Sequence, residues 1–497
     1  MNASLLQGLR TRGLPVHGDG VQIFAPTCGA SVDFSPLQNR VRDAAALDQV
    51  SIADLLRNAF VYPPHSIYRD VKFAISGFEE NQDLHRAPRF HFSYQSSRAP
   101  RPRLDAVDGT LLLKTYHELL CGAVSRSCAG MRSPWLMQSG GKDSTSMAIA
   151  AAEARPDVAC ITYLGGHEEN EVDSARFVAR QLGLRHEALV CDPGRAYERY
   201  LAMVPRMPLL TADFAMLSYA DLATEIAANG GDGVLDALGS DHYFGMPMHW
   251  RQRLKALLAL RLRLPRGLLE SRLISQNFRL SYLLGTLQMD AFERSFPGSR
   301  FSDVEVDALL GCPIADRSRQ RLMLFQADIE AASSMEARRR VAATIVESAS
   351  FGKGMFTTSA LSLLLAYPYR DERLCEWTFH EVPDALLIGP RGVNKVLVRQ
   401  HIAQHFQQLP YVRTKGSFRF DLCGLARQRF DQVHAFAVQA QSLLPGAVDW
   451  LESHRSRLDN KYLASKFYLL AITLPWLLNC MEKPVSQRTS RNYEGPP

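Results

Sequence analysis

The sequence lacks the cysteine patterns that would indicate an oxidised or zinc-bound fold. None of its nine cysteines form a C-x-x-C pair, so neither a zinc site nor a disulfide framework is indicated. The N-terminus, "MNASLLQGLRTRGLPVHGDG", has no long apolar core followed by a cleavage site, which argues against a signal peptide. We therefore expect a protein of the reducing cytoplasm.

Long uninterrupted apolar runs are missing as well. The most apolar late stretch, "YLASKFYLLAITLPWLLN", is short, and Lys466 and Pro475 interrupt it. A bilayer core needs about 20 consecutive apolar residues. This stretch therefore predicts a buried C-terminal helix rather than a membrane span.

A strong excess of one charge is also absent. The formal net charge is +6 over 497 residues, which permits binding of anions such as ATP or RNA without demanding it. Basic residues concentrate in residues 251–272, and there we favour amphipathic helices with a solvated arginine side over a nucleic-acid face. The length predicts two or three domains, or one large domain with an appendage.

Short apolar runs alternate with helical patterns from about residue 110 to residue 240. The runs predict strands at 133–138, 158–164, 187–191 and 231–238. Strands that alternate with helices predict an α/β fold with a doubly wound parallel sheet. From about residue 250 onward the chain is predicted to be mostly helical.

A glycine-rich segment, "QSGGKDSTS", follows the first predicted strand. A Walker A loop requires G-x-x-x-x-G-K-[ST]. Here Lys142 is followed by Asp143, and no glycine lies five residues before Gly141. The sequence therefore excludes a Walker A loop and leaves the pattern S-G-G-x-D-S between a strand and a helix.

This loop predicts a phosphate site that contains magnesium. The glycines let the backbone approach an anion, and the amides at the helix start would form a cradle for it. Ser139 and Ser144 add hydroxyl donors. Asp143 would repel a bare phosphate, so we expect it to hold a magnesium ion that bridges the phosphates.

A second acidic loop, "LDALGSDHYFG", places Gly239, Ser240 and Asp241 after another apolar strand. Alone, such a segment is more typical of a turn that caps a helix. In an open parallel sheet, however, loops at the carboxyl ends of strands meet around a ligand. Asp143 and Asp241 are therefore predicted to share one magnesium ion.

The two loops together resemble the ATP-pyrophosphatase family, and more narrowly the synthetase domain of asparagine synthetase. Further segments agree over residues 60–425: "VYPPHSIYRDVKFAISGF", "TYLGGHEENEVDSARFVARQLGLRHEAL", "LLLAYPYRDERLCEW", "NKVLVRQ" and "LPYVRTKGSFRF". In that family, ATP activates a carboxylate as an acyl-adenylate and releases pyrophosphate. An amine then attacks the acyl carbon and forms an amide.

The resemblance assigns roles by position. The residues that would bind pyrophosphate and magnesium are Ser139, Gly140, Gly141, Lys142, Asp143 and Ser144. Asp241 would complete the metal site, and Gly239 and Ser240 would shape its loop. Lys415 would face the reacting phosphate as a catalytic residue, Lys395 is a weaker candidate for such a role, and Arg413 is either a phosphate contact or a surface residue.

Two differences from the family concern the source of the amine and the base that would deprotonate it. The glutaminase nucleophile of asparagine synthetase is the cysteine after the initiator methionine, and here that residue is Asn2. We therefore expect ammonia from elsewhere, or an amine on a partner protein or on the substrate itself. Leu238 stands where the family has a glutamate or tyrosine, and it cannot act as a base. Asp236 and His242 are nearby alternatives.

The resemblance also suggests how the chain divides. Residues 1–105 would be a truncated remnant of an amidotransferase domain, ending in the Pro- and Arg-rich segment "SSRAPRPRLD". Residues 106–430 would form the ATP-pyrophosphatase domain, and residues 431–497 a helical extension. A homodimer or a partner protein is left open.

Three functions remain after these observations. The first is an amide-forming ligase for a small-molecule or peptide carboxylate that uses ATP and Mg²⁺, with a cyclising or natural-product biosynthetic role left open. The second is a tRNA-modifying enzyme of the same loop family, motivated by Lys142 and the basic run, although we expect no nucleic-acid partner. The third is a non-catalytic nucleotide-binding homologue, which the retention of Asp143 and Asp241 disfavours.

Overall fold

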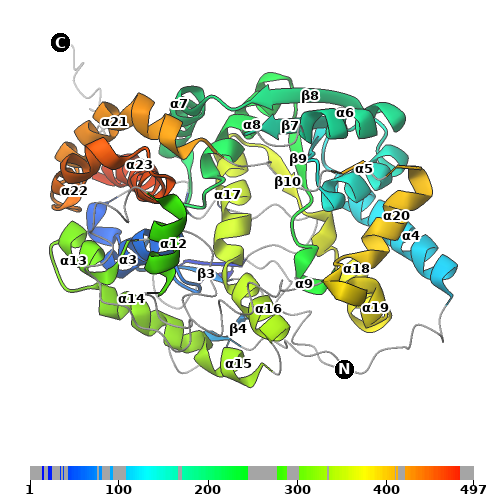
Figure 1. The fold of residues 1–497 in the computed structure, drawn as a ribbon, viewed down its shortest axis with the longest axis horizontal. Helices are drawn as coiled ribbons and strands as arrows, with labels where there is room; N and C mark the ends of the chain where they lie inside the picture. The colour runs from blue at the N-terminus through cyan, green and yellow to red at the C-terminus, as the bar shows by residue number, and fades with distance from the viewer. Residues whose placement is uncertain are drawn as a thin grey trace, which may run out of the picture.

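Five parallel strands form the central sheet of the molecule (Figure 1). The computed structural model describes residues 14–15, 21–24, 34, 37, 43–74, 78–80, 90–92, 108–165, 171–244, 277–287, 301–332, 335–408, 410–411 and 420–481. Within this part of the chain, the sheet has the strand order β10-β9-β6-β7-β8, and each neighbouring pair is parallel. The predicted α/β fold with a parallel sheet is confirmed.

Four of the five strands fall on the apolar runs that predicted them. These are β6 (Pro134–Met137), β7 (Ala159–Leu164), β8 (Arg185–Val190) and β9 (Gly233–Asp236). The edge strand β10 (Leu364–Ala366) was not predicted, because periodicity does not distinguish a short apolar run in a strand from one in a helix. The strand order reverses between β6 and β9, which pair although β7 and β8 lie between them in sequence.

The helices around the sheet that lie before residue 250 match the predicted alternation, and those after it belong to the part that was predicted to be mostly helical. They are α4 (Gly109–Ser127), α5 (Lys142–Ala154), α6 (Glu171–Gln181), α7 (Pro193–Met203), α8 (Met216–Ala228), α9 (Asp241–Phe244), α17 (Glu347–Ala360), α18 (Glu372–His380), α19 (Asp384–Leu387) and α20 (Val396–His405).

Helices cover both faces of the sheet because successive strand residues point to opposite sides. In β6, Trp135 and Met137 join one apolar core with residues of α7, α8 and α17. Leu136, between them, joins a second core with residues of α4, α5 and α20. Every residue of β6 is buried, as expected for a strand covered on both faces, so the sheet is doubly wound.

The remaining elements are mostly helical. They are α3 (Gln49–Asn58), α12 (Phe278–Leu287), α13 (Asp303–Leu310), α14 (Ala315–Leu322), α15 (Gln326–Ala331), α16 (Met335–Ile345), α21 (Leu422–Gln439), α22 (Ala447–His454) and α23 (Lys461–Met481), with β1 (Leu14–Pro15), β2 (Val21–Phe24), β3 (Val71–Ala74), β4 (Phe78–Glu80) and β5 (Phe90–Phe92). The prediction of a mostly helical C-terminal part is confirmed.

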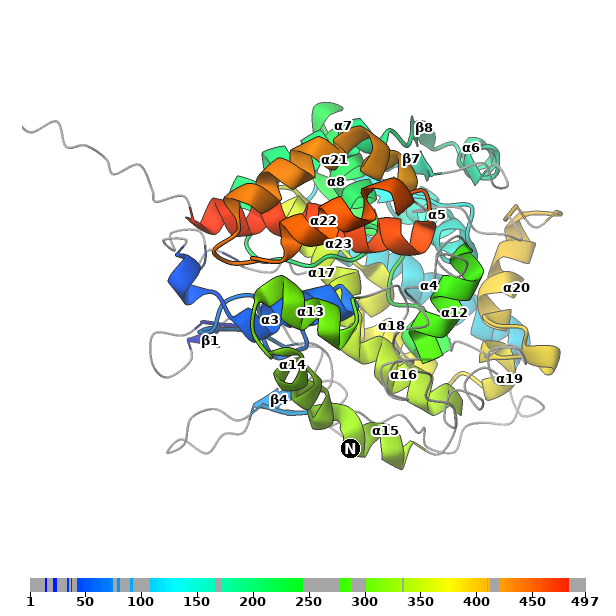
Figure 2. The ribbon, with the colours of Figure 1, turned by 60° about the vertical axis from the view of Figure 1, so that its left-hand side comes forward.

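Helix α3 joins the early part of the chain to elements much later in it. It packs against α13, α14 and α23 (Figure 2). Arg321 of α14 pairs with the buried Asp54 of α3 at 2.8 Å, and Arg57 of α3 pairs with Asp303 of α13 at 3.1 Å. These elements therefore share one core, and the division of the chain at residues 105 and 430 stays a prediction.

Helix α23 is the predicted apolar C-terminal helix. By length and composition it is the one candidate membrane span within the described residues, but 89% of its most apolar window is buried inside the protein. Lys466, which interrupts the apolar run, is also buried and pairs with Glu305 of α13 at 2.8 Å. These are the properties of a core helix, as predicted.

Candidate active site at the carboxyl end of the sheet

The two predicted loops leave the carboxyl ends of β6 and β9. The first runs into α5 and the second into α9. Because β6 and β9 are neighbours at the point where the strand order reverses, both loops lie where open α/β sheets bind their ligands. The structure thus brings together two segments that are far apart in sequence.

The first loop is held by hydrogen bonds among its own residues. The Ser139 amide donates to the Ser144 hydroxyl at 3.1 Å, and the Gly141 amide donates to the Ser139 hydroxyl at 3.1 Å. Gly141 is the N-cap of α5, and no side chain caps that helix. The amides at the start of α5 are therefore oriented by the loop rather than by a side-chain cap, as an anion cradle requires.

Gly140 lies against Glu171, a buried residue at the start of α6. Its amide donates to a Glu171 carboxylate oxygen at 3.2 Å. A Cβ atom at Gly140 would lie only 3.2 Å from the Glu171 Cα, so the close approach favours glycine. Glu171 lies in one of the segments that resemble asparagine synthetase, but its contact with the loop was not predicted from the sequence.

The second loop also depends on a glycine. Gly239 has a φ of +106°, a conformation that disfavours side chains, and a Cβ there would lie 2.9 Å from Cδ of Arg370. Arg370 is buried and pairs with Glu347 of α17 at 2.9 Å. Arg370 is thus a neighbour of this loop, and Glu347 is the partner of Arg370; neither was singled out from the sequence.

Lys395 connects the two loops. Its ammonium group lies 2.7 Å from Asp143 Oδ2, 2.6 Å from Asp241 Oδ1 and 2.8 Å from the Ser240 hydroxyl. Lys395 is 2% exposed and forms the N-cap of α20 with a φ of +57°. The weaker candidate of the sequence analysis is thus the residue on which both predicted aspartates converge.

The charges in this cluster compensate one another. Burial alone would lower the pKa of Lys395, but the carboxylates of Asp143 and Asp241 together raise that pKa above its usual value. Lys395 is therefore positively charged at neutral pH. We call Asp143, Ser240, Asp241 and Lys395 the charged cluster.

The charged cluster fits a magnesium ion by its chemistry. Asp143 Oδ2 accepts from Lys395, while Asp143 Oδ1 is buried and has no hydrogen-bond partner among the described residues. The Asp241 carboxylate is half exposed, so it remains accessible from solvent. Carboxylate oxygens are the ligands that Mg²⁺ prefers, and Asp143 Oδ1 is available as one.

Asp236 lies at the end of β9, close to the second loop. Burial raises the pKa of Asp236 to about 6, although Lys353 opposes this shift. Its Oδ1 accepts from the Leu238 amide at 3.1 Å, and its Oδ2 has no hydrogen-bond partner within the described part of the chain. Of the two alternatives to a base at Leu238, Asp236 is thus placed by the structure. The side chain of His242 lies outside the described residues.

The remaining predicted residues are placed in part. Lys142 begins α5, and its ammonium group lies 5.4 Å from the ring centre of Tyr411. Arg413 and Lys415 lie outside the described residues, as does the basic run 251–272. Tyr411, which precedes Lys415 by four residues, therefore lies beside the first loop.

Comparison with known proteins agrees with this geometry. The family model for asparagine synthase matches residues 115–452, a span that contains both loops and Lys395. A comparison with curated proteins gives no match. Members of the family use ATP, and the match supports an ATP-dependent, amide-forming carbon–nitrogen ligase of the asparagine synthetase type. The chain belongs to the asparagine synthase family.

Proposed function

We propose that the protein activates a carboxylate with ATP as an acyl-adenylate, releases pyrophosphate, and joins the acyl group to an amine. The observation that carries this proposal is the convergence of Asp143, Asp241 and Lys395 where the strand order reverses. A cation beside helix-start amides suits an anionic leaving group, and the two carboxylates suit a metal that binds the phosphates.

The residues of the first loop would hold the pyrophosphate part of ATP. In this proposal the amides of Lys142 and Asp143 and the hydroxyls of Ser139 and Ser144 bind the phosphate oxygens. Gly140 and Gly141, whose amides donate to Glu171 and Ser139, let the backbone approach the phosphates closely. Asp143 and Asp241 would hold Mg²⁺, which supplies positive charge to the phosphates when it is bound. Lys395 keeps its own positive charge beside the leaving group, and Lys415 remains the candidate for contact with the reacting phosphate.

We propose Asp236 as the first residue to test as the proton acceptor for the amine. A carboxyl group whose pKa is raised to about 6 is ionised at pH 7 and still basic enough to take a proton. The carboxylate substrate would be a small molecule or a peptide. The amine would come from free ammonia, from a partner protein, or from the substrate itself, and we propose that the reaction takes place in the cytoplasm.

The direct test is exchange of labelled pyrophosphate into ATP, screened against amino acids, β-amino acids and peptides. A carboxylic acid that supports exchange identifies the substrate class. In its presence, Asp143→Asn is expected to lower the exchange rate by at least about 100-fold, because a carboxylate proposed to hold Mg²⁺ at the phosphates is lost. Asp157→Asn, at an exposed aspartate paired with Arg155, is the matched control. Exchange that survives Asp143→Asn would reject the assignment.

A further inference from the structure

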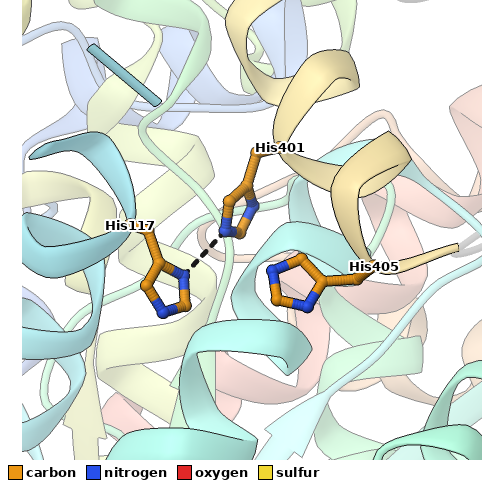
Figure 3. Close-up of side chains that lie close together, drawn as sticks. All are labelled: His117, His401 and His405. Atoms are coloured by element: carbon orange, nitrogen blue, oxygen red, sulfur yellow. Dashed lines mark hydrogen bonds between the residues drawn. The ribbon is translucent and has the colours of Figure 1, made fainter. Parts of the chain in front are cut away.

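Three histidines from two helices meet away from the charged cluster (Figure 3). His117 comes from α4, and His401 and His405 come from α20, one turn apart. Each offers a ring nitrogen, and these nitrogens all lie within 4.8 Å of one another. We call these three residues the histidine cluster.

The contacts of His117 determine which of its nitrogens carries the proton. Its Nε2 lies 2.8 Å from a carboxylate oxygen of Glu153 on α5. A carboxylate only accepts hydrogen bonds, so the Nε2–H of His117 donates to it. In a neutral ring the Nδ1 atom then carries a lone pair, and this atom faces His401 Nε2 at 2.9 Å.

The contacts of His401 favour the opposite nitrogen for its proton. Its Nδ1 lies 2.9 Å from the Ser146 hydroxyl, which in turn lies 3.0 Å from the Tyr116 hydroxyl. Tyr116 lies 3.2 Å from the Tyr369 hydroxyl, and Tyr369 donates to the Asp143 carbonyl.

The carbonyl at the end of this chain only accepts, so it sets the direction of donation. If His401 Nδ1–H donates to Ser146, each hydroxyl can donate to the next, and every contact up to the Asp143 carbonyl has one proton. The Nε2 atom of His401 then carries a lone pair as well.

With these tautomers, two lone pairs face each other across the 2.9 Å between His117 Nδ1 and His401 Nε2. This arrangement is repulsive unless a cation lies between them. In metal sites, ligating histidines donate their other N–H to a carboxylate or a neighbouring polar group. His117 has Glu153 as such a partner, and His401 has Ser146 in the tautomer above. His405 supplies a third nitrogen, and its exposure leaves room for solvent beside the cluster.

We propose that His117, His401 and His405 bind a divalent transition-metal ion of the zinc class. The ligands would be Nδ1 of His117, Nε2 of His401 and a ring nitrogen of His405, with water completing a tetrahedron. Neutral imidazole nitrogens suit Zn²⁺ rather than Mg²⁺. Glu153 and Cys121 both lie against Nε2 of His117, on the other side of its ring, so they stay outside the coordination sphere.

The position of the site gives the ion a structural role. It would clamp α20 onto α4, and α20 begins directly after Lys395, which contacts both aspartates of the charged cluster. The ion would thus fix the helix that presents Lys395 without contacting ATP. This inference does not depend on the proposed reaction, because a metal can bind here whatever the substrate is.

The test is a zinc titration of full-length, tag-free protein against a chromophoric chelator, repeated with Co²⁺. We expect one ion of high affinity per chain and the visible absorption of tetrahedral Co²⁺. His405→Gln is the informative variant, because His405 takes no part in the hydrogen-bond chain from Glu153 to Asp143. Loss of a residue that only orients a ligand costs about 10–100-fold in affinity, so loss of this ligand should cost at least about 100-fold.

The control is His434→Gln, at a histidine of α21 paired with Glu452, which should leave zinc affinity unchanged. The proposal is overturned if the wild type binds zinc no more tightly than His405→Gln, because a proton on His117 would then be the cation between the rings. It is also overturned if His434→Gln weakens binding as much as His405→Gln does.

Discussion

Polar clusters lie at both ends of helix α20, and they differ in how they balance charge. At its start, the ammonium group of Lys395 lies between the carboxylates of Asp143 and Asp241. At its end, ring nitrogens of His117, His401 and His405 lie within 4.8 Å of one another. The first cluster carries its own cation, so one of its two carboxylate charges is compensated before any ligand arrives. In our proposal, the second cluster has no cation of its own and gains stability by binding a metal ion.

The largest loss of stability and of exchange rate is expected at Lys395. Lys395→Met removes the cation and leaves two carboxylates close together without compensation. Breaking a buried pair costs about 3–5 kcal/mol, and we expect about 3 kcal/mol here because Asp241 is half exposed. Pyrophosphate exchange should fall by at least about 100-fold. Urea unfolding and the exchange assay measure these effects.

Lys461→Met, at an exposed lysine at the start of α23, is the control and should change neither quantity. Added Mg²⁺ is expected to stabilise Lys395→Met more than the wild type, because the ion can take the place of the ammonium group. Wild-type stability in Lys395→Met would show that the aspartates do not depend on their lysine.

A smaller effect is expected at Asp236, a buried carboxyl group at the end of β9 whose Oδ2 has no hydrogen-bond partner among the described residues. Its pKa is raised from 3.8 to about 6 by burial, so between these values the folded protein holds a proton that the unfolded chain has lost. The free energy of unfolding contributed by this group therefore falls as pH rises through that window. Asp236→Asn removes this titrating group. The free energy of unfolding of the variant, relative to that of the wild type, should therefore rise by about 2–3 kcal/mol between pH 4 and pH 7. Urea unfolding at several pH values measures the difference, and a difference independent of pH would contradict the assignment.

A substitution in the backbone of the second loop, at Gly239, should lower stability less than the change at Lys395 does. Gly239→Ala forces a Cβ into a positive-φ position and against Arg370, which we expect to cost about 1–2 kcal/mol. Gly109→Ala, where a Cβ would have nothing within 4 Å, is the matched control and should be nearly neutral. Thermal unfolding of both variants is the measurement. Equal stability would show that the loop adjusts without strain.

The smallest effect is expected at Ser146. A substitution there tests whether the two clusters are linked. Ser146→Ala interrupts the hydroxyl chain between His401 and Asp143, and should lower stability by about 1 kcal/mol. If the histidine cluster binds zinc, the affinity should fall by about 10-fold, because Ser146 orients His401. A zinc titration compares this variant with the wild type. An unchanged affinity would show that the two ends of α20 act independently.

The sheet and the two loops were predictable because their signals are local. Strands alternate with helices along the chain, and S-G-G-x-D-S and G-S-D follow their strands directly in sequence. Strand β10 was not predicted because it is only three residues long, too short for its periodicity to distinguish a strand from a helix. The expectation that Asp143 and Asp241 share a site is supported by their common contact with Lys395, whose own importance only the fold revealed.

The histidine cluster could not be found in the same way. His117 and His401 are 284 positions apart, and their contact depends on how α4 packs against α20. The one local signal was the spacing of His401 and His405, which places both on one face of a helix. Glu171 and Arg370 were missed for the same reason, because each lies against a loop from another part of the chain, and Glu347 was missed because it pairs with Arg370.

The packing of α3 against α23 affects the order in which the protein can fold during synthesis. Tyr68, shortly after α3, has its ring centre 5.6 Å from that of Trp476 in α23, and Tyr200 of α7 donates to the Ile472 carbonyl. Contacts between residues this far apart in sequence form only after much chain entropy has been lost. Until the ribosome has released α23, the apolar faces of α3 and α7 lack their partner and are open to aggregation. A premature stop within α23 would therefore yield chains that are prone to aggregate rather than a shortened enzyme.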